Sequence, residues 1–263
     1  MQFKIGTTLF IGGNSQYHLK SGIQGLDSPA IRTGDGVYAG RDGGFLSGHF
    51  YGQRTIVIPG FYIGSDCEEA AQLRTDLMSF MRIRYAMPMV ITDFGGNSYY
   101  TEGFVKDVKC NVTGPVAGDY QLTFLCPDPF LYKMTDPADV SSIWLDTSCS
   151  ITSGSGSVTI NNAGSVDIHP RITWSGQIKG FSITNTTTGE TFAIDDTVPS
   201  GQTVIDFNKR TIMVGSTCYN SHRLSTSSWF SLVPGENALT FSNSTSGNNS
   251  FHIQTPKMAK AGI

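Results

Sequence analysis

The residues that most often carry chemistry are dispersed along this sequence. The five histidines (His18, His49, His169, His222 and His252) lie far from one another and from the cysteines. Zinc sites need ligands at short characteristic spacings, yet the chain has no Cys-x-x-Cys and no His-Glu-x-x-His. A Gly-x-Ser-x-Gly elbow and a Walker-type phosphate loop are also missing. We therefore predict no catalytic residue, no metal site and no cofactor.

Three weaker patterns could suggest binding or acid–base chemistry. Gly34-Asp-Gly36 lacks the third glycine and the following helix that phosphate binding needs. Asp195 and Asp196 are adjacent, so on a strand they point to opposite faces, and we interpret them as the start of a turn. The densest basic cluster, Arg74, Arg82 and Arg84, is small, and the net charge is −3. Nucleic-acid binding needs more clustered cations, so a solvated helix face or a subunit contact is the better interpretation.

Two tryptophans in the second half of the chain leave a carbohydrate site open. Aromatic rings on a β-sandwich can stack on a sugar ring, but they also fill cores. Trp174 is in phase with Ile168 and Ile172, which favours the core. Trp229 follows a run of Ser and Thr and is less constrained, so it is the one candidate for carbohydrate contact.

Composition indicates a β-rich chain with many turns. It has 30 glycines in 263 residues, and only 15% of its residues are charged. Residues 11–52 contain 11 of the glycines. A loop that long and that flexible is usually functional or ordered by a partner, and we expect it to be ordered against a neighbouring copy of the chain.

The sequence of the first part of the chain predicts several strands and one helix. Arg54–Pro59 is a strand bounded by Pro59-Gly60. A capping box at Ser65 and Glu68 opens a helix over about 66–84, with Leu73, Leu77, Phe80 and Met81 on one stripe. Residues 89–92 and 98–101 form a hairpin, and a further strand follows from Phe104.

The clearest boundary is the strand that ends in Pro127 and Pro129. Tyr120, Leu122, Phe124 and Cys126 alternate with more polar residues, and the prolines then remove two backbone donors. We predict an N-terminal α+β domain over 1–132 and a join over 133–157. A C-terminal β-sandwich of jelly-roll kind follows over 158–250. We expect the tail, 251–263, to pack back on the first domain. In the sandwich, short strands recur between turn sequences, one of them at 229–233.

No secretory signal or long apolar span is evident in the sequence. We therefore expect a soluble chain, made in a cytoplasm and not inserted in a membrane. The five cysteines are widely spaced and odd in number, which predicts free thiols.

With these elements in place, the chain resembles the distal tail protein family of long-tailed (siphovirus-type) bacteriophages of Gram-positive hosts. The resemblance rests on four segments in the family's order: Gly25-Leu-Asp-Ser-Pro-Ala-Ile31, Arg54-Thr-Ile-Val-Ile58, Phe124-Leu-Cys-Pro-Asp-Pro-Phe130 and Pro234-Gly-Glu-Asn-Ala-Leu-Thr-Phe241.

The resemblance implies a non-enzymatic structural hub of the tail tip, or baseplate. Its first domain would build a homo-hexameric ring between the tail tube protein and the tip, with a channel that DNA crosses without specific binding. Its second domain would be galectin-like and hold a tail-associated lysin, fibre or receptor-binding protein. Two alternatives stay open: a carbohydrate-binding module that attaches the virion to the host surface, and an enzyme such as a wall hydrolase. For the ring we predict intersubunit contacts from 11–52 and from the hairpin around 94–101.

Overall fold

A computed structural model describes residues 1–79, 84–151, 154–195, 197–244 and 249–263. The chain divides into two compact units. The first comprises Met1–Val140 and Lys260–Ile263, and the second comprises Ser141–Ala259. Strands dominate both units, which confirms the prediction of a mainly β protein with one long helix.

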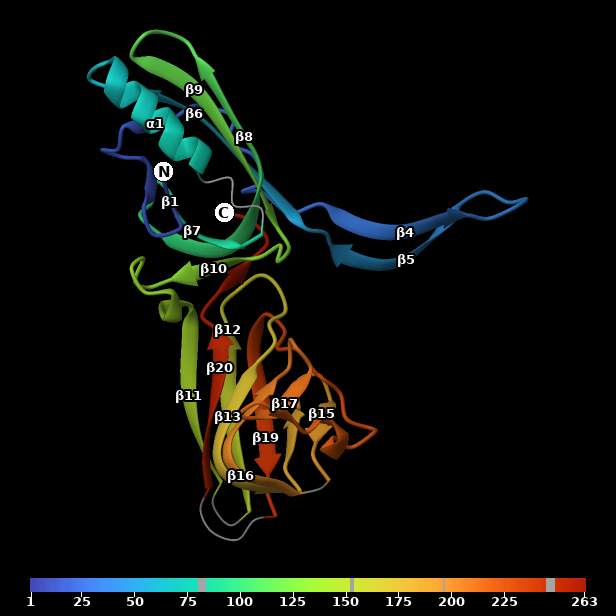
Figure 1. Cartoon of the computed structure of the whole chain (residues 1–263). Helices are drawn as coiled ribbons and strands as arrows, with labels where there is room; N and C mark the ends of the chain where they lie inside the picture. Colours follow the sequence, from blue (N-terminus) through green and yellow to red (C-terminus); the bar gives the residue numbers. More distant parts are fainter. Residues whose placement is uncertain (80–83, 152–153, 196, 245–248) are drawn as a thin grey trace. The chain divides into compact units, whose positions relative to one another are not determined.

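The first unit is built on a curved antiparallel sheet with the strand order β2-β1-β7-β8-β9-β6-β3. The outermost strands β2 and β3 contact each other, so the sheet closes toward a barrel (Figure 1). β10 pairs with β8, and the short β21 spans the division between the units. The strands are β1 (Gln2–Ile5), β2 (Leu9–Gly12), β3 (Tyr17–Leu19), β6 (Arg54–Ile63), β7 (Met87–Thr92), β8 (Ser98–Val112), β9 (Ala117–Cys126), β10 (Leu131–Met134) and β21 (Ala259–Lys260).

Strand β9 shows how the sequence pattern builds this sheet. Tyr120, Leu122, Phe124 and Cys126 are all buried, as their alternation predicts. β9 pairs with β6 along its whole length and with β8 on its other side. Since it lies between two partners, β9 is an interior strand of the sheet, and the following Pro127 ends it.

Strand β6 corrects one prediction, because it runs through Pro59 instead of stopping there. Pro59 still aligns with Gln121 of β9. Its carbonyl, on the side of β3, accepts from the Lys20 N–H at 2.9 Å, just beyond the end of β3. A proline is tolerated where the neighbouring strand ends, because the missing N–H then breaks no ladder.

Helix α1 (Cys67–Ser79) packs Ala70, Leu73 and Leu77 into the core. The predicted continuation through Phe80 and Met81 lies outside the described residues. The predicted cap is displaced by one position. The Asp66 carboxylate accepts from the Glu69 N–H at 2.8 Å, and the Glu69 carboxylate accepts from the Ser65 N–H. Asp66 caps the helix in place of Ser65, because a carboxylate accepts more strongly than a hydroxyl at the positive end of a helix.

The hairpin expected around residues 89–101 is confirmed by the pairing of β7 with β8. The Asp93 carboxylate closes its turn by accepting from the Asn97 N–H at 2.8 Å. β8 continues without interruption to Val112, so the separate strand expected from Phe104 belongs to the same element.

The second unit is all β, with one sheet in the order β11-β20-β13-β16-β17-β18 and another in the order β12-β19-β14-β15. Trp174 is buried and stacks on Phe251 with ring centroids 5.1 Å apart, so its predicted core position is confirmed. The strands are β11 (Trp144–Ile151), β12 (Ser155–Asn162), β13 (Arg171–Lys179), β14 (Ser182–Asn185), β15 (Glu190–Ala193), β16 (Thr197–Asp206), β17 (Thr211–Val214), β18 (Thr217–Cys218), β19 (Gly235–Ser242) and β20 (Asn249–Pro256).

Two strands of this unit fall where the sequence indicated a join and a tail. β11 lies within 133–157 and pairs over eight positions with β20, which takes up the first part of the expected tail. β11 is hard to recognise because it is an edge strand, and only Cys149 and Ile151 face the core. Residues 140–143 and 220–222 form short 3₁₀ helices, η1 (Val140–Ile143) and η2 (Asn220–His222). The strand expected at 229–233 is wrong: Leu232 makes an isolated bridge with Ile168.

Candidate assembly surface

The second half of the glycine-rich segment 11–52 forms a separate two-stranded hairpin, β4 (Ile31–Val37) and β5 (Gly44–Tyr51). Its first half joins the main sheet through β2 and β3, so the expectation of a single loop over 11–52 is wrong there. Figure 1 shows the hairpin extending away from the main sheet of the first unit. Six of the seven β4 residues are exposed. A two-stranded hairpin is marginally stable in water, so this element needs either internal support or a partner.

Internal support comes from phenylalanine rings placed over glycines. Gly36 pairs with Phe45 across the hairpin, and a Cβ on Gly36 would lie 2.5 Å from the Phe45 ring. Gly48 sits at a bulge with φ +66°, and the ring of Phe50 lies against it. An aromatic ring that covers a glycine compensates for the missing side chain, which explains why glycines and aromatics alternate in this segment.

The hairpin nevertheless presents apolar side chains to solvent. Val37 is 86% exposed, Phe50 65% and Ile31 59%. Several large apolar side chains exposed on one element favour an interaction site.

The root of the hairpin is held by close backbone and aromatic contacts. Gly25, with φ +84°, approaches β6 so closely that a Cβ would lie 1.9 Å from the Thr55 carbonyl oxygen. Where the two legs of the hairpin meet, the Gly52 N–H donates to the Ala30 carbonyl at 2.6 Å. Tyr51 also packs edge-on against Phe130, with centroids 5.4 Å apart.

Arg54, the first residue of β6, organises this root. Its side chain is only 1% exposed, and it donates to backbone carbonyls from three separate segments. Nε donates to Pro129 at 2.7 Å, Nη1 donates to Gly25 and to Asp27, the latter at 2.7 Å, and Nη2 donates to Ala261. Burial lowers the Arg54 pKa, and the nearby Asp128 and Asp27 act in the opposite direction. The sequence marks Arg54 as part of a motif but does not reveal these partners.

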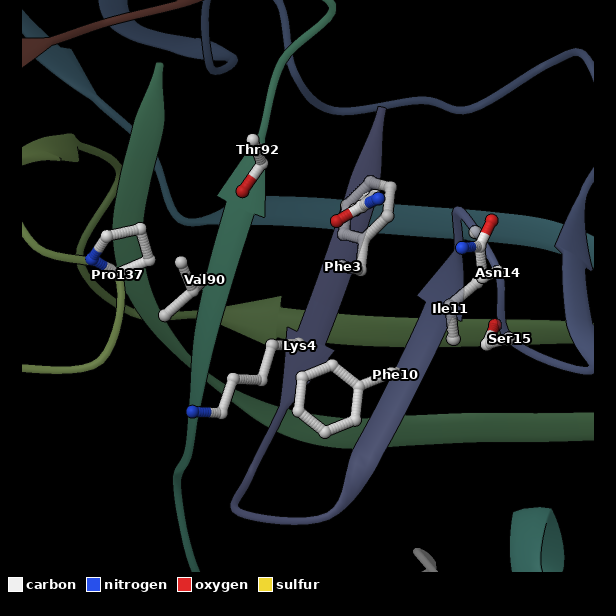
Figure 2. Close-up of a pocket in the computed structure, with 11 residues that line it drawn as sticks. Phe3, Lys4, Phe10, Ile11, Asn14, Ser15, Val90, Thr92 and Pro137 are labelled. Atoms are coloured by element: carbon white, nitrogen blue, oxygen red, sulfur yellow. The ribbon is translucent and has the colours of Figure 1, made fainter. Parts of the chain in front are cut away.

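A second candidate surface lies on the outside of β1, β2 and β7 (Figure 2). It is a concavity of about 250 Å³ whose lining includes Lys4, Phe10, Val90 and Pro137. Phe10 is 52% exposed, and the Lys4 ammonium lies 5.7 Å from the centre of its ring, within cation–π range. We call this surface the Phe10 groove. No sequence motif predicts this groove, because its residues come from three strands.

Phe94 lies in the turn that follows β7 and is 89% exposed. Among the described residues no other large apolar side chain is more exposed. The turn follows directly on β7, whose Val90 and Thr92 line the Phe10 groove, so the two surfaces are close together along this strand.

Trp229, the candidate for carbohydrate contact, is half-buried in an aromatic cluster. Its ring lies 4.7 Å from that of Phe192 and 5.4 Å from that of Phe207, centre to centre. The Arg223 guanidinium lies 6.0 Å from the ring centre. Part of the ring is therefore held by core residues, and the rest remains accessible.

The remaining chemistry-bearing residues stay dispersed in space. Among the described residues, no three His, Cys, Asp or Glu side chains come together in a way that could hold a metal ion. All five cysteines are free thiols, as predicted. Asp196 and Arg82 lie outside the described residues, so neither the aspartate pair nor the arginine cluster can be placed. None of the described helices has the length and hydrophobicity needed to cross a membrane.

These features define the class of protein: a two-unit β protein whose most unusual surfaces are exposed apolar elements of its first unit. Residues 163–254 match the family described as siphovirus-type tail component, C-terminal domain. The match lies within the second unit and confirms the resemblance to phage distal tail proteins.

Comparison with solved structures supports the same fold over the whole chain. The crystal structure of the SPP1 Dit protein, described as a paradigm of the hub adsorption apparatus in phages that infect Gram-positive bacteria, is 17% identical with a TM-score of 0.69. The alignment covers 97% of this chain and 98% of that one. A phage P2 baseplate chain, in the activated conformation with Ca, is 12% identical over 96% and 97% of the two chains, with a TM-score of 0.45. A search of curated proteins found no match.

Proposed function

We propose that this protein is the structural hub of a phage tail tip, and that its first unit assembles into a hexameric ring. The observation that carries the proposal is the β4–β5 hairpin, with its exposed apolar side chains and firmly held root. A chain with the fold of a described hub protein and an element that needs a partner is well suited to self-assembly.

Ring closure needs two different surfaces on each copy, because a head-to-tail contact repeats around an axis. The hairpin supplies one surface. The turn at Phe94 and the adjoining Phe10 groove supply the other, so that the hairpin of one copy docks on the groove side of the next.

In this proposal the ring joins the tail tube to the tip and leaves a channel for DNA. A net charge of −3 suits a conduit, because a strongly basic lining would hold DNA that must pass. The second unit holds tip components, which include a tail-associated lysin, fibre or receptor-binding protein. The protein is made in the host cytoplasm, acts in the virion and has no enzymatic role.

The test is the mass of the assembled protein. Native mass spectrometry and negative-stain imaging should give six-fold rings, either of the protein alone or with tube and tip partners. A chain that stays monomeric under all of these conditions would overturn the proposal.

The carbohydrate-binding alternative rests on the accessible part of Trp229 and the nearby Arg223. A glycan array and a cell-wall pull-down test it, with Trp229→Ala as the variant. Binding that the variant abolishes would support the alternative, and the absence of binding by the unaltered protein would remove it.

A further inference from the structure

The segment that returns from the second unit, residues 260–263, belongs to the first unit and lies against the root of the hairpin. The Ile263 N–H donates to the Leu26 carbonyl at 3.0 Å. Gly262 fits so closely that a Cβ would lie 3.0 Å from the Asp27 carbonyl carbon. Ile263 also packs on the main core of the first unit.

Arg54 links this segment to both legs of the hairpin. Gly25 and Asp27 lie on the leg that enters the hairpin, and Arg54 itself lies on the leg that leaves it. The guanidinium therefore binds the entering leg and the carbonyl of Ala261 at the same time. A buried guanidinium needs all of its donors paired, because an unsatisfied buried charge is costly. Loss of the Ala261 carbonyl would leave Nη2 without that acceptor and admit water to the root.

We propose that residues 260–263 act as a latch. By binding Arg54 they fix the direction of the β4–β5 hairpin and make it competent to assemble. These residues follow the second unit in the chain, whereas the hairpin root lies near residue 25. The root is therefore complete only after the second unit has been synthesised, so a partial chain does not enter the ring. The assembly part of this inference rests on the proposed function, and the structural part does not.

The latch can be displaced by a single substitution in the full chain. Gly262→Val places two methyl groups against the backbone of Leu26 and Asp27 and should lift the segment away. Gly114→Val is the matched control, because a Cβ at Gly114 meets nothing within 4 Å. Ile263→Ser is a milder second variant, which removes apolar packing but keeps the backbone hydrogen bond.

Hydrogen exchange measured by mass spectrometry tests the structural part. We expect the amides of residues 25–28, 30 and 52–54 to exchange roughly tenfold faster in Gly262→Val, as the loss of one hydrogen bond to a charged group implies. Ile263→Ser should show a smaller rise, and Gly114→Val none. Unchanged exchange at the root in both latch variants would overturn the latch.

Native mass spectrometry of the same variants tests the assembly part. Rings in the unaltered protein and in Gly114→Val, but not in Gly262→Val, would support it. Rings of Gly262→Val with a fast-exchanging root would overturn it. If the unaltered protein forms no ring, the proposed function fails, and the exchange data still decide whether Arg54 and residues 260–263 hold the root.

Discussion

Truncation of Phe50 should weaken assembly without unfolding the monomer. Its side chain is 65% exposed in the hairpin. A phenylalanine has roughly 200 Å² of surface to bury, so about 130 Å² is available to a partner. At about 25 cal/mol per Å², covering that area contributes about 3 kcal/mol to each interface, or roughly 100-fold in the association constant between two copies. The monomer should lose no more than about 1 kcal/mol, because the ring covers Gly48 within the hairpin but is otherwise in water.

The assay compares ring formation by Phe50→Ala with that of the unaltered protein across a concentration series, by light scattering after size exclusion. Leu145→Ala is the control, because Leu145 is an exposed apolar residue of the second unit, which is not proposed to build the ring. Thermal unfolding of both variants checks the monomer. Assembly of Phe50→Ala at the concentrations of the unaltered protein would refute the assignment of the hairpin to the interface.

Three further predictions concern the folded chain. Burial raises the pKa of Tyr17 to about 12, above its unfolded value of about 10. The stabilisation is therefore complete below pH ~10 and is lost between pH ~10 and ~12, which urea titrations should show and Tyr17→Phe should diminish. Asp66→Ala should cost about 1 kcal/mol of unfolding free energy and Ser65→Ala less than half of that in the same titration, whereas equal losses would restore Ser65 as the cap. In thiol labelling at pH 8 the exposed Cys67 and Cys218 should react fast. Cys126 and Cys149 should react slowly, because burial raises the pKa of both thiols to about 11. Rapid labelling of either buried thiol would contradict the core described.

Prediction from the sequence succeeded where local pattern and packing agree. The alternation in β9, the stripe of α1 and the turn after β7 each identified their elements, because period and capping are local properties. Prediction failed where a neighbouring strand, distant in the sequence, decides the local structure. Pro59 lies inside a strand because β3 ends beside it, and β11 is a strand because β20 pairs with it.

The candidate surfaces divide in the same way. The excursion was recognisable from its glycines, and Trp229 from its polar context. The Phe10 groove was not, because Lys4, Phe10 and Val90 lie on three strands that only the sheet order brings together.

By itself, then, the sequence determined that this is a β-rich chain of two parts, with a glycine-rich segment in the first and without the catalytic motifs named above. These properties depend on composition and short-range periodicity. The tertiary structure decided which residues hold the excursion in place. Arg54 meets Gly25, Pro129 and Ala261, partners up to 207 residues away along the chain. A buried guanidinium can take any carbonyl that the fold delivers to it, so only the folded chain reveals which ones it binds.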